Sequence, residues 1–283
     1  MNFSIIIPTY NKLPRLKLTL KSLYSQLSEF SNYEVIIIDD GTDISFSNEF
    51  ELLRRKYDFL YYKTKNLGRS YARNIGLFNA TKKTIFFLDD DIILSPKFIE
   101  THINIQNSNP CILHGEIKNF IYSYPFVDPL NCEKIFFDNV MNDNTIRLCS
   151  EKCKLLKSLD YTEIYNVSKE TKIEKAIKNV FLKNSLHKWI SFNGANISCP
   201  KQWLLDENGF DEKFGITWGC EDLELGYRLN LSQHPFRYSI EASCCHLTHI
   251  RKDYKKEHNT SLSYFYNKYK DERILEVSNL LFN

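Results

Sequence analysis

The stretch TIFFLDDDIILSPKFI, residues 84–99, decides the fold because a strand of core character ends there in three adjacent carboxylates. Asp89, Asp90 and Asp91 repel one another when all three are ionised. In an extended segment, Asp89 and Asp91 would point one way and Asp90 the other. A divalent cation with oxygen ligands, such as Mg²⁺, Mn²⁺ or Ca²⁺, would offset the repulsion. The alternative is that the three side chains cap the next helix and lie in solvent.

Apolar runs alternate with helical patterns on both sides of this stretch. Four leucines between residues 16 and 27 recur at spacings of four, three and four, which is typical of one face of a helix. Ser95 as N-cap and Pro96 at the first helical position predict a further helix to about residue 106. The expected strands are 3–7, 33–38, 59–62 and 84–88, and the expected helices are 16–27, 50–57, 70–80 and 95–106.

Strands that alternate with helices predict an α/β fold with a mainly parallel central sheet flanked by helices. In such sheets, ligands bind beyond the carboxyl ends of the strands. Three polar segments follow those ends here, namely residues 8–11 (PTYN), 39–41 (DDG) and 89–91 (DDD). We therefore expect these segments to meet at one edge of the sheet and to form a single site.

The composition and the chain start argue against several classes of protein. The 283 residues carry 37 Lys and Arg against 35 Asp and Glu, and this net charge of +2 gives no support to nucleic-acid binding. No run reaches the roughly 18 apolar residues of a membrane span, and Met1 leads directly into a predicted strand, so we expect no signal peptide. A cytoplasmic protein with eight reduced cysteines follows. A structural zinc site is disfavoured because Cys149 and Cys153 have no second pair at ligand spacing.

Five segments, in this order, resemble the family 2 glycosyltransferases with the GT-A fold. They are FSIIIPTYNK (3–12), YEVIIIDDGT (33–42), NLGRSYARNIGL (66–77), TIFFLDDDIILSP (84–96) and FNGANISCPKQWLLDENGFDEKFGITWGCEDLELGYRL (192–229), the last resembling galactosyltransferase-like C-terminal regions. The resemblance covers residues 1–106 and about 190–250. It implies one GT-A nucleotide-diphospho-sugar transferase domain over residues 1–283. Its expected parts are a nucleotide-sugar-binding half (1–106), a helical or irregular insert facing the acceptor (107–190), an acceptor and catalytic half (191–254) and a C-terminal helix (255–283).

The resemblance implies a UDP-sugar donor at the ends of the first strands. Pro8 and Tyr10 would pack on the uracil, and Asp40 would accept its N3–H; core packing of Tyr10 and turn capping by Asp40 are the alternatives. Gly68 would let the chain approach the ligand closely. Arg73 would orient Asp40 or touch the nucleotide, unless it only forms a surface salt bridge. The implied donor-binding residues are Pro8, Thr9, Tyr10, Asp40, Gly68, Arg73, Asp89 and Asp90.

The resemblance also implies a metal centre and a general base. Asp91 matches the last residue of the family's D-x-D motif and would bind the metal. His249 would be a further ligand, with His246 as the alternative, and a nitrogen ligand favours Mn²⁺ over Mg²⁺. Asp222 would be the base, although a carboxylate at a helix start is also favoured by the helix dipole. The residues implied for the donor or acceptor sugar are Gly194, Asn196, Trp218, Gly219 and Glu221.

The function expected from this resemblance is inverting, metal-dependent transfer of a hexose or an N-acetylhexosamine from a UDP-sugar. The acceptor would be a saccharide, a lipid-linked sugar or a peptide. A non-catalytic nucleotide-sugar-binding module and a sugar nucleotidyltransferase are the alternatives, although the latter favours a Gly-rich loop where PTYNK stands. A dinucleotide-dependent dehydrogenase is excluded because no G-x-G-x-x-G follows the first strand.

The C-terminal stretch, residues 255–283, is expected to pack on the domain. The alternative is contact with the inner face of a membrane. The sequence leaves open the sugar, the acceptor and the oligomeric state. The residues expected on the packed face of this stretch are Leu262, Phe265, Tyr266 and Tyr269.

Overall fold

The computed structural model describes residues 2–135, 141–250 and 253–282. In the first third of the chain, strands and helices alternate as predicted, and each predicted strand lies within two residues of its expected bounds. The elements are β1 (Phe3–Thr9), α1 (Leu13–Leu27), β2 (Tyr33–Asp39), η1 (Ile44–Phe46), α2 (Ser47–Lys56), β3 (Leu60–Lys63), α3 (Arg69–Asn79), β4 (Thr84–Leu88), β5 (Ile92–Leu94) and α4 (Phe98–Ser108).

The helix predicted to begin at Ser95 and Pro96 begins later. Residues 92–94 form β5, a strand that the sequence analysis missed, and α4 starts at Phe98. The Ser95 N–H donates to the carbonyl of Ser243, and the Ser95 carbonyl accepts from the N–H of Phe98. The Ser–Pro pair therefore forms the turn between β5 and α4 instead of the first helical turn.

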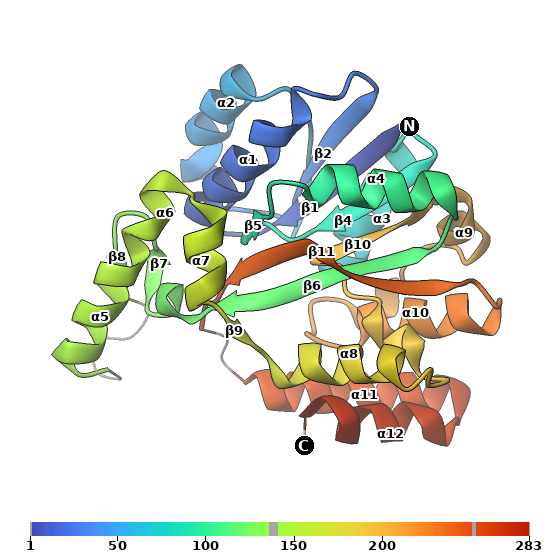
Figure 1. Cartoon of the computed structure of the whole chain (residues 1–283). Coiled ribbons are helices and arrows are strands. Elements are labelled where there is room, and N and C mark those ends of the chain that lie inside the picture. Colours follow the sequence, from blue (N-terminus) through green and yellow to red (C-terminus); the bar gives the residue numbers. More distant parts are fainter. Residues whose placement is uncertain (1, 136–140, 251–252, 283) are drawn as a thin grey trace.

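One sheet joins both ends of the chain (Figure 1). In the described residues it has nine strands in the order β3-β2-β1-β4-β10-β6-β11-β5, with β9 paired to β6. The pairs among β1–β4 are parallel, as is the pair β6–β11, whereas β10 runs antiparallel to β4 and β6. The later strands are β6 (Ile112–Phe120), β9 (Lys169–Glu170), β10 (Asn196–Pro200) and β11 (Phe236–Leu247). This mostly parallel sheet between helices confirms the predicted fold class.

The connection between β4 and β5 forces the sheet to curl. The two strands lie four positions apart in the sheet order, which is roughly 19 Å across a flat sheet at ~4.8 Å per strand. Residues 89–91 alone join Leu88 to Ile92, and a segment of that length reaches at most roughly 14 Å. The sheet therefore bends until β5 comes near β4. The three aspartates lie in the turn where it closes.

Alternation along the strands divides the core into two layers. Ile5 and Ile7 of β1 belong to the layer covered by α1, α2 and α4, whereas Ile6 belongs to the layer covered by α3, α8 and α10–α12 (Figure 1). The helices that complete the second layer are α8 (Lys172–Leu182), α10 (Glu221–Leu231), α11 (Tyr254–Tyr269) and α12 (Glu272–Phe282), and α9 (Lys201–Asp206) follows β10.

The segment 107–190 was predicted to be helical or irregular. This prediction is wrong for the first part of the segment. Residues 112–120 form β6, a central and largely buried strand, so the elaboration begins only after it. Three helices of this elaboration share a small core with Phe120, Phe126 and Leu247, beside the ends of β6 and β11. The elements are η2 (Ile121–Ser123), β7 (Phe126–Asp128), β8 (Glu133–Ile135), α5 (Asp143–Cys153), α6 (Leu155–Ser158), α7 (Tyr161–Val167) and, after α8, η3 (Lys188–Ser191).

The C-terminal stretch forms two helices instead of the single helix predicted. Lys270, in a left-handed conformation, separates α11 from α12. Phe265 is buried in the core and Leu262, Tyr266 and Tyr269 pack against that core, as the packing interpretation predicted. Among the described residues, no helix combines the length and apolar character that a membrane span requires.

Gly76 is the point of closest contact between α3 and β1, and it provides a test of the packing. A Cβ at this position would lie 2.3 Å from Cγ2 of Ile6. Overpacking of this kind costs about 1–3 kcal/mol, which outweighs the roughly 1 kcal/mol that alanine gains over glycine in a helix. We therefore expect Gly76→Ala to lower the free energy of unfolding in urea.

Ile6→Ala removes the clashing methyl group and supplies the matched background. In that background Gly76→Ala should be neutral or stabilising. An equal loss in both backgrounds would contradict the contact.

Candidate active site

The three polar strand ends meet as the sequence predicts. The hydroxyl of Thr9, at the end of β1, donates to Asp90 Oδ2 at 2.6 Å, and the Asp40 N–H donates to the Thr9 carbonyl at 2.8 Å. The end of β11 joins them, because the Leu247 N–H donates to the carbonyl of Asp91 at 2.7 Å. Segments from both ends of the chain thus surround the aspartate turn.

An extended segment was predicted to point Asp89 and Asp91 one way and Asp90 the other. This prediction is wrong, because residues 90 and 91 lie in a turn. Asp89 points to Arg73, with 3.1 Å between the carboxylate and the guanidinium. Asp90 and Asp91 both face the ammonium of Lys12, at 3.5 and 2.7 Å. The solvent-exposed alternative is also wrong, because Asp90 is 4% and Asp91 0% exposed.

Asp91 lies beside both candidate histidines. One ligand atom each from Asp91, His246 and His249 lies within 4.8 Å of the others, and both Nε2 atoms are 3.4 Å from Asp91 Oδ2. Antiparallel pairing of β11 with β5 places His246 opposite Ile92, the residue next to Asp91. The geometry therefore brings both histidines together and not only the preferred His249.

The outer nitrogens of the two imidazoles are fixed by oxygen acceptors. His246 Nδ1 lies 3.2 Å from Asn119 Oδ1, and His249 Nδ1 lies 3.1 Å from the carbonyl oxygen of Ile250. A carbonyl oxygen can only accept, so Nδ1 of His249 carries the proton and its Nε2 presents a lone pair. Burial, helped by the positive charge of Lys12, lowers the pKa of His249 to about 2, so this ring is neutral.

The neutral imidazole of His249 directs a lone pair at the Asp91 carboxylate, and a cation between them would turn this repulsive contact into an attractive one. Burial alone would raise the pKa of Asp91, but Lys12 and the two histidines outweigh it and hold that pKa well below its usual range. The other oxygen of Asp91, Oδ1, is buried without a hydrogen-bond partner. One carboxylate and two imidazoles suit a divalent transition metal, so these residues fit the expected Mn²⁺.

A second cluster surrounds the buried guanidinium of Arg73. Its Nη1 lies 3.0 Å from Asp222 Oδ1 and 3.4 Å from Glu221 Oε1, and its Nη2 lies 3.1 Å from Asp89 Oδ1. Arg73 is 1% exposed and lies over the ring of Phe210, 5.4 Å from its centroid. The surface salt bridge considered for Arg73 is thus wrong. So is its predicted orientation of Asp40, because its partners are three other carboxylates.

Asp222 lies in the first turn of α10, after Glu221, as predicted, and its environment suits a base. Its Oδ2 accepts from the Gly194 N–H at 3.1 Å, and its side chain is 21% exposed. Burial raises the pKa of Asp222, and the negative charges of Glu221 and Asp89 add to this rise against the opposing effect of Arg73. The resulting pKa is about 7. A carboxylate with this pKa can both take up and release a proton near neutral pH.

The residues expected around the nucleobase differ in exposure and in hydrogen bonding. Tyr10 is 43% exposed, which excludes core packing, and Pro8 is half-buried beside it in sequence. The Asp40 carboxylate accepts from the Thr64 hydroxyl and from the N–H groups of Leu67 and Gly68, at 2.7 to 2.8 Å. It therefore caps the loop before α3, which is a different turn from the one at Gly41.

Gly68 and Gly194, both expected at the donor site, lie in close contact with other parts of the chain. A Cβ on Gly68, whose φ is +100°, would meet the Gly215 carbonyl oxygen at 1.8 Å. A Cβ on Gly194 would lie 2.5 Å from the Arg73 guanidinium. Both glycines therefore allow close packing inside the chain. The close approach of a donor to the backbone of these two glycines stays a prediction.

Asn196 is also turned away from the expected sugar. It is 0% exposed, and its amide lies 3.0 Å from His102 Nε2 and donates to the Ala242 carbonyl at 2.9 Å. Its hydrogen-bonding groups are thus used inside the sheet. The predicted role in binding sugar hydroxyls is not compatible with this position.

The remaining predicted residues are neighbours in the chain: Trp218 and Gly219 lie in the turn before α10, and Glu221 is the first residue of that helix. Trp218 is half-buried, and its ring lies edge-on to Tyr254 at 6.3 Å between centroids. Gly219 has a φ of +102°, and a Cβ there would approach His258 Nδ1 to 3.0 Å, so glycine is required. Glu221 is 5% exposed and faces Arg73.

The sequence analysis missed Lys12 and Asn119. Lys12 was considered only as part of the PTYNK segment. Its place in the short loop between the first strand and the first helix puts it at the same edge of the sheet as the aspartates. Asn119 gave no local signal, because its contact with His246 depends on the pairing of β6 with β11.

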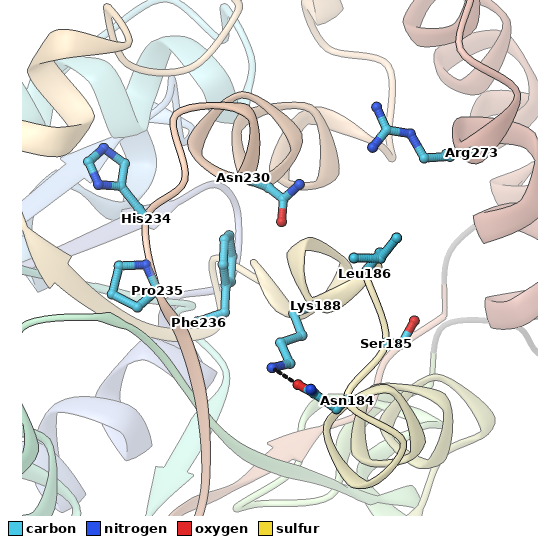
Figure 2. A pocket seen from close by; sticks show the side chains of 9 residues that line it. All are labelled: Asn184, Ser185, Leu186, Lys188, Asn230, His234, Pro235, Phe236 and Arg273. Carbon is cyan, nitrogen blue, oxygen red and sulfur yellow. Dashed lines mark hydrogen bonds between the residues drawn. The ribbon is translucent and has the colours of Figure 1, made fainter.

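Two surface hollows lie away from this site. One, of about 480 Å³, is lined by residues that include Lys188, Asn230, Phe236 and Arg273 (Figure 2). Phe236 begins β11, roughly 35 Å of strand before its end near the aspartates. The other, of about 550 Å³, is lined by residues of α8 and α12, including Val180 and Glu276. Neither hollow includes a predicted site residue.

Comparison with known proteins relates the N-terminal part of the chain to a glycosyltransferase family. Residues 4–124 match the model of "Glycosyl transferase family 2". The chain is 28% identical over 234 residues to a chondroitin synthase of Pasteurella multocida, covering 81% of this chain and 23% of that protein. Across three such curated relatives, the chain spans between 23% and 34% of their length.

Solved structures agree on the fold. TarS (residues 1–349) of S. aureus in complex with UDP-GlcNAc superposes with a TM-score of 0.59 at 15% identity, covering 94% of this chain and 64% of that one. The mannosyltransferase PcManGT of Pyrobaculum calidifontis, in complex with GDP-Man and Mn²⁺, gives a TM-score of 0.59 at 12% identity, with 94% and 63% covered. Residues 4–124 thus match the family 2 glycosyltransferases, and the chain as a whole has the GT-A fold of these solved structures.

Proposed function

We propose that this chain catalyses inverting, metal-dependent transfer of a hexose or an N-acetylhexosamine from a UDP-sugar. The acceptor is a saccharide, a lipid-linked sugar or a peptide. The observation that carries the proposal is the linkage of two clusters through Arg73. It joins Asp222, a carboxylate with a pKa of about 7, to Asp89 in the turn that also holds Asp91.

The donor side of the proposal rests on Asp91, His246 and His249. These residues would hold Mn²⁺, which supplies Lewis-acid stabilisation of the diphosphate leaving group. Mg²⁺ is the alternative, although two imidazoles favour the transition metal. The complexes of TarS with UDP-GlcNAc and of PcManGT with GDP-Man and Mn²⁺ support a nucleotide-sugar donor and a divalent ion.

The catalytic step is assigned to Asp222. Its carboxylate takes the proton of the acceptor group while the acceptor atom bonds to C1 of the sugar. The bond from C1 to the diphosphate oxygen breaks with its electron pair on the nucleotide, and the single displacement inverts the anomeric centre. Arg73 and the Gly194 N–H fix the base, and the partly exposed Trp218 offers a ring face to a sugar.

Calorimetric titration of UDP into the protein, with Mn²⁺ and with EDTA, tests the donor site. We expect binding that requires Mn²⁺, and we expect Asp91→Ala to weaken it at least about 100-fold, because the variant loses the only anionic member of the Asp91–His246–His249 cluster. Asp222→Asn should bind UDP normally. Asp206→Ala, which changes an exposed aspartate on α9, is the matched control.

Equal UDP binding in Mn²⁺ and EDTA would refute metal dependence. Binding of GDP in place of UDP under the same conditions would move the donor class to guanosine diphosphate sugars.

The pH dependence of UDP release from a UDP-sugar tests the base. Because the pKa of Asp222 is raised to about 7, its carboxylate is deprotonated above that pH and becomes protonated as the pH falls. The rate should therefore decrease about tenfold per pH unit well below pH 7 and level off above it. Asp222→Asn should lose about 10²–10⁴-fold in rate and retain Mn²⁺-dependent UDP binding.

A non-catalytic binding module predicts a different result, because it would bind UDP and release none from any UDP-sugar. A sugar nucleotidyltransferase would release diphosphate or a sugar phosphate instead of UDP. An unchanged rate in Asp222→Asn would leave the fold assignment intact and overturn the choice of base.

A further inference from the structure

Lys12 occupies the position that a bound cation would be expected to take. It lies immediately before α1, at the end of the loop that follows β1. Its ammonium is 2.7 Å from Asp91 Oδ2 and 3.5 Å from Asp90 Oδ1, and its side chain is 26% exposed. The same oxygen of Asp91 is the one that His246 Nε2 and His249 Nε2 approach at 3.4 Å.

The ammonium of Lys12 is a closer neighbour of Asp91 Oδ2 than either imidazole, at 2.7 Å against 3.4 Å. The buried guanidinium of Arg15 is near Asp90 and Asp91, but its hydrogen bonds go to the carbonyls of Leu247, Ser123 and Phe126. Arg73 is directed to Asp89. Among the described residues, Lys12 is therefore the cation that pairs directly with the Asp91 carboxylate.

A divalent cation held by Asp91 Oδ2 and the two Nε2 atoms would lie within a few ångströms of this ammonium. Two positive charges at that distance repel strongly in a largely buried site. The divalent cation and Lys12 therefore compete for the same carboxylate oxygen.

We propose that Lys12 is the resident counter-ion of Asp91, and that a divalent cation displaces it toward the diphosphate of the bound nucleotide. This inference rests on the proposed function, because the nucleotide diphosphate is the new partner of the displaced ammonium. Metal alone then binds weakly, since Lys12 must give up its nearer partner, Asp91 at 2.7 Å, and keeps only Asp90, at 3.5 Å, as a counter-charge. Nucleotide and metal together bind tightly, and each raises the affinity for the other by the same factor.

A permanent ion pair is the competing account. In that case the metal would use Asp91 Oδ1, the buried oxygen without a partner, while Lys12 stays on Oδ2. Removal of the ammonium would then relieve its repulsion of the metal to the same extent with and without nucleotide, so UDP would raise the Mn²⁺ affinity equally in Lys12→Met and in the unmodified chain.

The two accounts differ in how nucleotide changes the effect of removing Lys12. We would measure Mn²⁺ binding without nucleotide by the EPR signal of free Mn²⁺, using the full chain. Lys12→Met should bind Mn²⁺ about tenfold or more tightly than the unmodified chain, because no ammonium has to be displaced. Lys12→Arg keeps the charge and should bind Mn²⁺ no more tightly than the unmodified chain. Lys17→Met, at an exposed lysine of α1, should leave the affinity unchanged.

The same variants are then measured with UDP present. The unmodified chain should gain Mn²⁺ affinity when UDP is added, whereas Lys12→Met should gain distinctly less. Lys12→Gln, which keeps a neutral hydrogen-bond donor, repeats the test with a second side chain. Damage to the fold would weaken Mn²⁺ binding. A gain of Mn²⁺ affinity therefore cannot result from misfolding of a variant.

Mn²⁺ affinity in Lys12→Met and Lys12→Gln that is equal to or lower than that of the unmodified chain would overturn the inference. This failure is distinct from failure of the proposed function, in which the unmodified chain shows no Mn²⁺-dependent UDP binding whatever residue stands at position 12.

Discussion

The buried guanidinium of Arg73 is the interaction on which the arrangement of the site depends. A buried arginine is costly unless its charge is paired and its donors are used. Here the paired carboxylates are Asp89 in the β4–β5 turn and Glu221 and Asp222 at the start of α10. These segments are more than 130 residues apart in the chain, so the docking of α10 near the aspartate turn is coupled to the position of α3. Gly194 is required beside it because any larger residue would enter the space of the guanidinium.

Arg15 has the complementary role on the other side of the aspartate turn. It is 1% exposed, and its hydrogen bonds go to the carbonyls of Ser123, Phe126 and Leu247 instead of to carboxylates. Leu247 lies between His246 and His249, so α1 fixes the segment that carries both imidazoles. Burial lowers the pKa of Arg15, and Asp91 and Asp90 oppose this shift by keeping the charged form favourable. The first helix thus positions the segment that carries His246 and His249 through contacts with its backbone.

The sequence predicts those parts of the site that follow from local pattern. Apolar runs gave β1, β2 and β4, and the parallel-sheet rule placed Thr9, Asp40 and the aspartates at one edge. The failures are at positions where a distant segment decides the conformation. Residues 92–94 became a strand because β11 returns to pair with them, which also moved the start of α4 to Phe98.

Side-chain direction was the least predictable property. Asn196 sits in a motif that resembles a sugar-binding turn, yet pairing of β10 with β4 and β6 buries it beside His102. Gly194 and Gly68 were correctly recognised as positions of close approach, but the approaching groups are Arg73 and the backbone of Gly215. A motif therefore indicates that a small or polar residue is needed, whereas only the tertiary neighbours reveal what it contacts.

Two carboxylates of this site acquire opposite properties from the charges around them. Asp91 is fully buried, yet Lys12, His246 and His249 keep its pKa well below the usual range, so it stays ionised and pairs with the Lys12 ammonium. Asp222 has one cation, Arg73, shared with two further carboxylates, so its pKa rises to about 7 and it exchanges a proton. The pKa values of the two carboxyl groups differ because positive charge predominates around Asp91 and negative charge around Asp222. The turn at residues 89–91 makes it possible, because it directs Asp89 toward Arg73 and Asp91 toward Lys12 within three residues of chain.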